Sequence, residues 1–281
     1  MSPANGNSSS LPRTADIVIL GAGVMGASIA FHLAKRNPGK IIVIDKDHVG
    51  RGGSGRSSAL VRMHYSFPPE VQLALISLRM FQNWQISSPI VIAAMGPWTR
   101  PLLQQVDCDL PIECEYHQVA ILRNTPEMKG GGCACIDSVT ETYFRSDAHD
   151  KFLVDDFYGT RPVDPDDFPQ RASDESLEGI IERACRRIPK LAGAEVMRGV
   201  TGVYDMTPDS RPLLGEIRGI SGLYVCAGFS GMGFKISPAI GLVMSEVVLD
   251  GKGRTLDISA FRPHRFADHQ PIKAEHEYVD D

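Results

Sequence analysis

The stretch DIVILGAGVMGASIAFHLAKRNPGKIIVID, residues 16–45, decides the fold. Its two ends, residues 16–20 and 41–45, are short apolar runs rich in β-branched residues, which are typical of buried parallel strands. Residues 27–36 between them have a helical pattern that ends before the breaker sequence Asn-Pro-Gly. The sequence therefore predicts a strand, helix and strand unit of a parallel sheet.

A glycine motif follows the first of these strands, with Gly21, Gly23 and Gly26 in the spacing G-x-G-x-x-G. The first glycine allows a tight turn, the second lets the backbone approach a pyrophosphate, and the third lets helix and strand pack closely. Asp45 ends the second strand, where it can accept hydrogen bonds from an adenosine ribose. The motif predicts a dinucleotide site; a glycine turn without a ligand is the alternative. It does not distinguish FAD from NAD, and the neighbouring Lys46 leaves a 2′-phosphate open.

A second glycine-rich stretch, GFSGMGFKISPAIG at residues 228–241, follows an expected strand at residues 222–228. Glycine at this density is unfavourable in conformational entropy, and a main chain that must lie against a ligand is one reason for it. We expect a helix to start near Ser237 and Pro238 and to end at Gly251. Its N-terminus would direct positive potential toward a ligand held by the glycines.

The segment between the two glycine stretches begins with α/β character. A loop rich in glycine and serine at residues 48–58 precedes an expected amphipathic helix at residues 68–84 and a buried strand at residues 89–94. The stretch from about residue 111 to 205 differs, because it alternates apolar and polar residues and is broken by loops rich in Pro, Gly and Asp. This change predicts an antiparallel, β-rich insertion within an α/β domain.

The insertion has one clear strand and one clear helix. Residues 112–123, IECEYHQVAILR, alternate like an antiparallel strand, and residues 175–188 predict a helix capped by Ser173 or Asp174. The predicted domain limits are a disordered tail at residues 1–13, a dinucleotide-binding domain at 14–105 and 206–266, a substrate domain at 106–205, and a C-terminal tail at 267–281.

Composition and charge exclude some classes of protein. The net charge is −5 and no block of lysine and arginine stands out, which argues against binding to nucleic acid or to an anionic membrane. No apolar run is long enough to span a bilayer, and the N-terminus lacks the apolar core of a signal peptide. The six cysteines form no C-x-x-C pair, so no metal site is expected. We expect a soluble, cytoplasmic protein.

Five motifs in a fixed order carry a resemblance to a known family. They are GAGVMG (21–26), GRSSALVRMHY (55–65), VIAAMGPW (91–98), YDMTPDSRPLLGE (204–216) and GFSGMGFKISPAIG (228–241). With these motifs the chain resembles the FAD-dependent D-amino-acid oxidase and sarcosine oxidase/dehydrogenase superfamily. The resemblance implies an α/β fold: a Rossmann-type FAD-binding domain, split in sequence, with an inserted antiparallel β-rich substrate domain.

The resemblance also implies which residues bind FAD. By position, they are Gly21, Ala22, Gly23, Val24, Met25, Gly26, Asp45, Lys46, Ser57, Ser58, Gly231, Met232, Gly233 and Phe234. Met232 stands where sarcosine oxidases usually have histidine. Gly202 stands where the monomeric sarcosine oxidases have the cysteine that links flavin covalently, so the resemblance implies non-covalent FAD.

Two catalytic residues follow from the same resemblance. Arg62 matches an arginine close to the flavin, although the position three residues earlier, often arginine in sarcosine oxidases, is Ala59. Lys235 matches the lysine that pairs with the substrate carboxylate. A structural ion pair is the alternative for Arg62, and a solvated loop charge is the alternative for Lys235. His64 and Tyr143 are weaker candidates, because lone histidines and tyrosines are more often core or rim residues.

One departure concerns the join QISSP at residues 85–89. The family normally has a long segment there, so the chain looks shortened between residues 84 and 90. The function implied is oxidation of the C–N bond of a small amino acid or N-methylated amine by hydride transfer to FAD, with oxygen or a carrier as electron acceptor and with an oligomer left open. The alternatives are a shortened, non-catalytic FAD-binding or interaction protein and, third, an NAD-dependent dehydrogenase.

Overall fold

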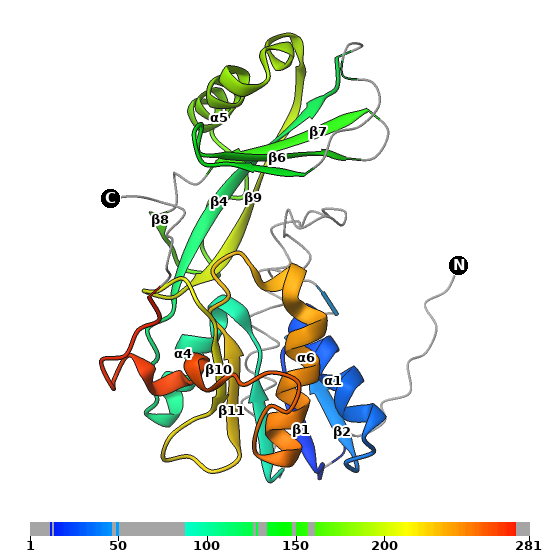
Figure 1. Ribbon diagram of the computed structural model, residues 1–281, viewed down its shortest axis with the longest axis vertical. Helices are drawn as coiled ribbons and strands as arrows, with labels where there is room; N and C mark the ends of the chain where they lie inside the picture. The colour runs from blue at the N-terminus through cyan, green and yellow to red at the C-terminus, as the bar shows by residue number, and fades with distance from the viewer. Residues whose placement is uncertain are drawn as a thin grey trace.

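The computed structural model describes residues 12, 14–46, 49–50, 88–125, 128, 134–147, 150–156 and 161–273. Two sheets make up the described part, and Figure 1 shows them as separate layers joined by the long strands β4 and β9. The expected loop at residues 48–58 falls almost entirely outside the described residues, and the expected helix at 68–84 lies outside them altogether.

The lower layer is a five-stranded sheet in the order β10-β11-β3-β1-β2. Its strands are β1 (Ile17–Leu20), β2 (Ile41–Ile44), β3 (Ile90–Ala93), β10 (Leu213–Glu216) and β11 (Leu223–Ala227). All neighbours pair in parallel except β10, which runs antiparallel to β11. The predicted strand, helix and strand unit is confirmed, and segments from the two ends of the chain form one sheet.

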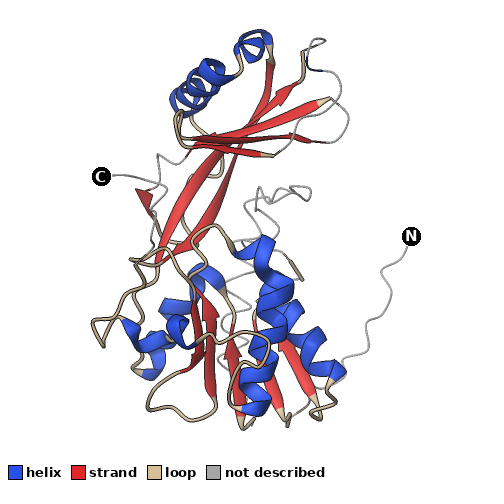
Figure 2. Cartoon of the chain, viewed as in Figure 1, coloured by secondary structure: helices blue, strands red, loops and turns tan. Residues whose placement is uncertain are grey.

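Two helices, α1 (Val24–Lys35) and α6 (Gly233–Asp250), pack against each other on one face of this sheet (Figure 2). The contact is close because Gly241 lies against Ser28, whose hydroxyl donates a hydrogen bond to the carbonyl of Ser237 at 2.8 Å. The core of this layer is apolar and includes Ile19, Ile29, Leu33, Ile92, Val243 and Met244.

Both helices start earlier than the sequence predicts. Helix α1 starts at Val24 instead of residue 27, and α6 starts at Gly233 instead of near Ser237 and Pro238. Proline has no N–H group to give to the carbonyl of Phe234, but the Ser237 hydroxyl donates to that carbonyl at 2.9 Å. Pro238 therefore lies inside the helix.

The segment that follows α6 is fixed to the same layer by a buried ion pair. Arg265 is fully buried, and its guanidinium bonds both carboxylate oxygens of Asp209 at 2.8 and 2.6 Å. The same guanidinium donates to the carbonyls of Pro212 and Arg211 at 2.9 and 2.7 Å. This network satisfies a charge that would otherwise be costly to bury.

The upper layer is an antiparallel sheet in the order β5-β6-β7-β4-β8, with β9 paired along the full length of β4. Its strands are β4 (Glu113–Arg123), β5 (Cys135–Asp137), β6 (Thr142–Asp147), β7 (Lys151–Asp156), β8 (Arg161–Pro162) and β9 (Glu195–Met206). Together with the parallel sheet, this sheet confirms the predicted fold class. The predicted domain limits stay predictions.

Helix α5 (Asp174–Arg187) covers one face of the antiparallel sheet (Figure 1). Ser173 caps it, since its hydroxyl accepts a hydrogen bond from the N–H of Ser176. The covered face is apolar and carries Ala120, Leu122, Phe144, Phe152 and Val154. Because side chains alternate along strands, the neighbouring residues of β4, β6 and β7 point to the opposite face, which we call the inner face.

Candidate active site

The first glycine turn connects β1 to α1 through bare backbone. Gly21 has φ +102°, and a Cβ there would lie 2.5 Å from the carbonyl oxygen of Ala94, the residue just after the neighbouring strand β3. A Cβ on Gly26 would overlap the carbonyl oxygen of Gly21. Gly23 is the N-cap residue of α1 and has no side chain that could cap the helix, and the first turn holds no acidic residue. The positive end of the helix dipole therefore lies at this glycine turn, with no negative side chain in the first turn of the helix to offset it.

Asp45 stands beside this turn at the carboxyl end of β2. Its Oδ2 accepts a hydrogen bond from the Ala22 N–H at 2.6 Å, while the Gly21 N–H donates to the Ile44 carbonyl at 2.7 Å. The carboxylate is half-buried. The turn and the acidic residue are thus held together, as the sequence motif predicts for a nucleotide site.

The second glycine turn is held by a buried carboxylate from the antiparallel sheet. Gly228 and Gly231 have φ +75° and +79°, values that favour glycine. Asp205 of β9 accepts a hydrogen bond from the Gly228 N–H at 2.6 Å, and its carbonyl accepts one from Ser230 at 2.9 Å. Burial raises the pKa of Asp205 to about 6, although hydrogen bonds from the backbone N–H groups of Gly228 and Phe229 lower it.

The two turns meet. A Cβ on Gly233, the first residue of α6, would lie 3.0 Å from the Met25 side chain in the first turn of α1. Helix α6 also has no side-chain cap and no acidic residue in its first turn. The N-termini of two helices therefore lie side by side at the carboxyl edge of the parallel sheet, an arrangement that favours an anionic ligand.

These features fit a dinucleotide such as FAD. The glycines of the turn themselves place no side chain at the N-terminus of α1, and Asp45 is fixed within reach of the same turn. In open α/β sheets, ligands bind outside the carboxyl ends of the strands, which is where both turns lie. The residues that would hold the group are Gly21 to Gly26, Asp45 and Gly231 to Phe234.

Lys46 has protein partners of its own. Its Nζ lies 2.9 Å from a carboxylate oxygen of Asp166 and 3.9 Å above the centre of the Trp98 ring. The Trp98 indole N–H donates to the same Asp166 oxygen at 2.9 Å. Lys46 thereby joins the end of β2 to the segment that follows β8, and its contact with a cofactor stays a prediction.

Lys235 lies in the first turn of α6 instead of in a loop, because that helix starts at Gly233. Its side chain is exposed. Ser57, Ser58 and Arg62, together with His64, lie outside the described residues. The structure thus brings Lys235 to the same edge as the two glycine turns and leaves the other four residues as predictions.

Above the second turn lies a group of polar side chains that the sequence analysis largely missed. They occupy the inner face and comprise His117 of β4, Tyr143 of β6, Asp155 of β7 and Tyr204 of β9. A Cβ on Gly231 would lie 3.1 Å from the Tyr204 ring, so this ring rests on the glycine turn. The polar group therefore faces the proposed cofactor edge.

His117 stacks on Tyr204 with ring centroids 4.0 Å apart. Both ring nitrogens are buried, and neither has a hydrogen-bond partner within the described part of the chain. Burial lowers the pKa of His117 to about 4, so the ring is neutral near pH 7 and offers one donor and one acceptor. A histidine within the alternating run at residues 112–123 was the available sequence signal.

Asp155 and Tyr143 form the deepest part of the group. The fully buried Asp155 accepts a short hydrogen bond from the Tyr143 hydroxyl and another from the Asp156 N–H at 2.7 Å. The Tyr143 and Tyr204 hydroxyls are 3.3 Å apart. Burial raises the pKa of Asp155 well above its ordinary value, and the bond from Tyr143 only partly opposes this.

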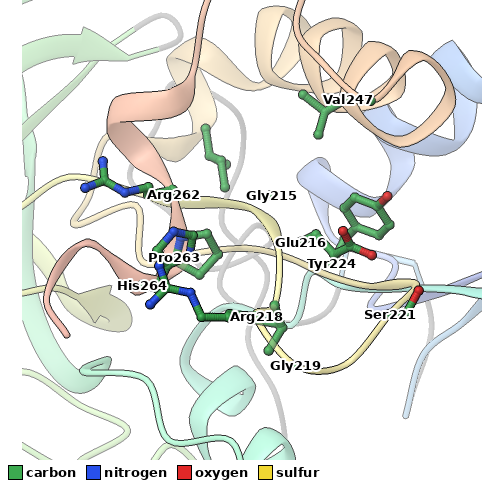
Figure 3. Close-up of a pocket in the computed structure, with 13 residues that line it drawn as sticks. Gly215, Glu216, Arg218, Gly219, Ser221, Tyr224, Val247, Arg262, Pro263 and His264 are labelled. Atoms are coloured by element: carbon green, nitrogen blue, oxygen red, sulfur yellow. The ribbon is translucent and has the colours of Figure 1, made fainter. Parts of the chain in front are cut away.

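A separate cavity of about 650 Å³ lies at the opposite end of the parallel sheet (Figure 3). It is lined by residues of β10, the turn after it and the start of β11, including Glu216, Arg218 and Tyr224. Arg218 is engaged by both carboxylate oxygens of Asp268. This cavity is remote from the glycine turns, which follow the carboxyl ends of the strands.

Comparison with known families identifies the chain. The model of the DAO family, described as FAD dependent oxidoreductase, matches residues 16–89 and 82–247. This chain belongs to the DAO family of FAD-dependent oxidoreductases. The resemblance stated from the five motifs is thereby confirmed. The two matched segments meet at residues 82–89, the position of the short join.

Relatives agree with this assignment. The chain is 24% identical over 204 residues to FAD-dependent oxidoreductase domain-containing protein 1 of Xenopus laevis, covering 68% of this chain and 41% of that protein. It is 28% identical over 195 residues to monomeric sarcosine oxidase of Bacillus sp. (strain B-0618), covering 65% and 48%. The chain thus spans less than half the length of these two relatives.

Solved structures show the same fold. L-proline dehydrogenase from P. horikoshii superposes with a TM-score of 0.76 at 18% identity, covering 92% of this chain and all of that one. None of the helices in the described ranges is long and apolar enough to span a membrane.

Proposed function

We propose that this chain binds FAD without a covalent link and oxidises the C–N bond of a small amino acid or N-methylated amine. The observation that carries the proposal is the meeting of the N-termini of α1 and α6, whose first turns hold no acidic residue, below a group of polar side chains. When bound, FAD supplies a two-electron acceptor for hydride. Family membership supports the cofactor, and the named relatives support the class of substrate.

Different residues of the chain would bind the cofactor and the substrate. The N-terminus of α1 would hold the pyrophosphate, and Asp45 would accept hydrogen bonds from the ribose. The main chain at residues 231–234 would lie against the flavin edge, where the α6 N-terminus stabilises negative charge. Lys235, in the first turn of α6, would hold the substrate carboxylate and so orient the α-carbon.

Gly202 supports a non-covalent cofactor. It pairs with His117 in the ladder between β4 and β9, beside the polar group, and has no side chain that could form a link to flavin. Denaturation of the FAD-loaded protein should therefore release all of its flavin into the supernatant.

A second function, a shortened FAD-binding protein without catalysis, is favoured by one observation. The two matched family segments, residues 16–89 and 82–247, overlap at the short join, where the sequence predicts a missing internal segment. An absorption spectrum recorded before and after anaerobic addition of sarcosine, proline and D-amino acids separates the two functions. Bleaching of the flavin supports the oxidoreductase, and a yellow protein that no amine bleaches supports the alternative. A colourless protein that binds NAD would support a dehydrogenase.

Lys235→Ala tests the residue expected to bind substrate. We expect a rise in KM of at least about tenfold with FAD retained, because removing a charge-assisted hydrogen bond costs about 1.5–3 kcal/mol. Lys252→Ala, just beyond the other end of α6, is the matched control, since that side chain is also exposed. Equal kinetics for the two variants would remove Lys235 from the site.

A further inference from the structure

Three side chains on the inner face form a continuous hydrogen-bonded chain. Tyr204 lies within 3.3 Å of Tyr143, hydroxyl to hydroxyl, and the Tyr143 hydroxyl donates to the Asp155 carboxylate. Three different strands contribute the residues, and Tyr143 and Asp155 are direct partners in the ladder between β6 and β7. The outer end rests on the glycine turn, and the inner end is fully buried.

The chemistry of these three groups allows the hydrogen-bonded chain to carry a proton. Each hydroxyl can donate and accept, and a carboxylate can take up a proton. Because the single hydroxyl proton of Tyr143 is donated to Asp155, Tyr204 is the donor in the bond between the two tyrosines, and both bonds point toward Asp155. The hydrogen-bonded chain therefore connects the buried carboxylate of Asp155 to Tyr204, which lies against the second glycine turn.

The surroundings leave Asp155 without a cationic partner among the described residues. Tyr143 faces it from β6, where Arg145, the next residue on the same face, donates a hydrogen bond to the Ser146 carbonyl at 3.2 Å. The residues of β4 on the same face next to β7 are the apolar Val119 and Ile121. The nearest cation on the α5 side, Arg183, pairs instead with Asp156, which points to the other face. A buried carboxyl in such surroundings has its pKa raised, which brings its proton affinity closer to that of an amine.

We propose that Asp155 takes up, through Tyr204 and Tyr143, the proton that the substrate ammonium must lose before its C–N bond is oxidised. The inference rests on the proposed function. The ammonium N–H gives its proton to the Tyr204 oxygen, the Tyr204 proton moves to Tyr143, and the Tyr143 proton moves to Asp155. The nitrogen keeps the electron pair of the broken N–H bond, and Asp155 becomes a neutral carboxylic acid.

Asp155 is thus a positioning residue that acts through the tyrosines.

The path also predicts which substrates are accepted. The amine must carry at least one N–H proton in its charged form, and a quaternary ammonium, which has none, cannot use the path. Choline-like compounds should therefore neither reduce the flavin nor protonate Asp155.

The first test is the pH profile of anaerobic flavin reduction by an amine that reduces the wild-type protein. In Asp155→Asn, the apparent pKa for reduction should rise toward that of the free ammonium. The rate at neutral pH should then fall about tenfold for each pH unit by which that pKa rises, and it should recover at alkaline pH. Tyr143→Phe should show the same profile. Tyr116→Phe, on the same sheet but the opposite face, should match the wild type. A loss of rate that is equal at every pH would overturn the proposal.

The second test needs no turnover. In infrared spectra of the FAD-loaded protein recorded at decreasing pH, the C=O band of a protonated carboxyl should grow as Asp155 takes up a proton, and this band should be absent in Asp155→Asn and shifted in Tyr143→Phe. A wild-type spectrum without that band at any pH would contradict proton uptake by Asp155. If no amine reduces the flavin, the proposed function fails, and the infrared band still decides whether Asp155 takes up a proton through Tyr143.

Discussion

The carboxyl edge of the parallel sheet and the inner face of the antiparallel sheet are built in opposite ways. At the edge, Gly21, Gly26 and Gly233 remove side chains so that backbone groups lie close together. On the face, the half-buried Tyr143 and the fully buried Asp155 are titratable side chains that bond to each other. The first region works through main-chain dipoles and the second through proton-bearing groups, which matches binding of an anionic cofactor and chemistry on a substrate.

The largest expected effect comes from adding a methyl group to the edge. Gly26→Ala places a Cβ on the carbonyl oxygen of Gly21, so we expect loss of FAD binding and a much lower Tm. Gly179→Ala is the matched control, because it is also a helical glycine but its Cβ would meet only the Arg183 side chain, at 3.6 Å. The control should stabilise the protein by about 0.5–1 kcal/mol. Similar melting curves for both would contradict the close packing of the turn.

The next effect tests whether the parallel-sheet domain also depends on a side-chain charge. Arg265→Met leaves the Asp209 carboxylate buried without its ion partner and should destabilise the protein by about 3–5 kcal/mol in denaturant unfolding. Arg218→Met removes an exposed ion pair with Asp268 and should change stability by about 1 kcal/mol or less. Equal losses of unfolding free energy in the two variants would mean that the burial of the Arg265 ion pair adds nothing to stability.

The smallest effect concerns Asp205, where the two regions meet. Asp205→Ala leaves the Gly228 N–H without its acceptor and should cost about 1–3 kcal/mol, whereas Asp205→Asn keeps an acceptor oxygen and should cost less. Affinity for FAD, measured by flavin fluorescence, should fall in the same order. Equal affinity for FAD in both variants would mean that the hydrogen bond between Asp205 and the glycine turn does not support FAD binding.

Asp205 also has a predicted pH signature. Because its pKa is raised to about 6 in the folded protein, the folded state binds more protons than the unfolded one between about pH 4 and 6. The contribution of Asp205 to stability is therefore fully present below about pH 4 and is lost as the pH rises through 6. Unfolding of the wild type relative to Asp205→Asn should show this decline, and a flat difference would argue against a raised pKa.

Much of the parallel layer was predictable because its signals are local. The apolar run before Gly21, the glycine spacing and Asp45 all lie within one unit of the chain. The predicted start of α6 was wrong because the prediction placed Pro238 at the beginning of the helix. In the structure, the Ser237 hydroxyl donates to the Phe234 carbonyl that the proline leaves without a donor, so the helix can begin before the proline.

The inner face was less predictable because strand register, not spacing, brings its residues together. Tyr143 and Asp155 become partners only through the pairing of β6 with β7, and Tyr204 comes from a strand about 60 residues further along the chain. Sequence reasoning named Tyr143 as a weak candidate and did not name the other members as a group. No single position carries the signal, since each residue type is also common in ordinary cores.

The contact of Trp98 with Lys46 and Asp166 has a practical consequence. The indole touches an ammonium on one side and a carboxylate on another, and these two groups come from the parallel sheet and from the segment after β8. Its emission is therefore sensitive to any change in the spacing of those segments, and a bound isoalloxazine would quench it by energy transfer. The chain contains only two tryptophans, so a variant with phenylalanine in place of Trp84 would leave one optical reporter of how its two halves are joined.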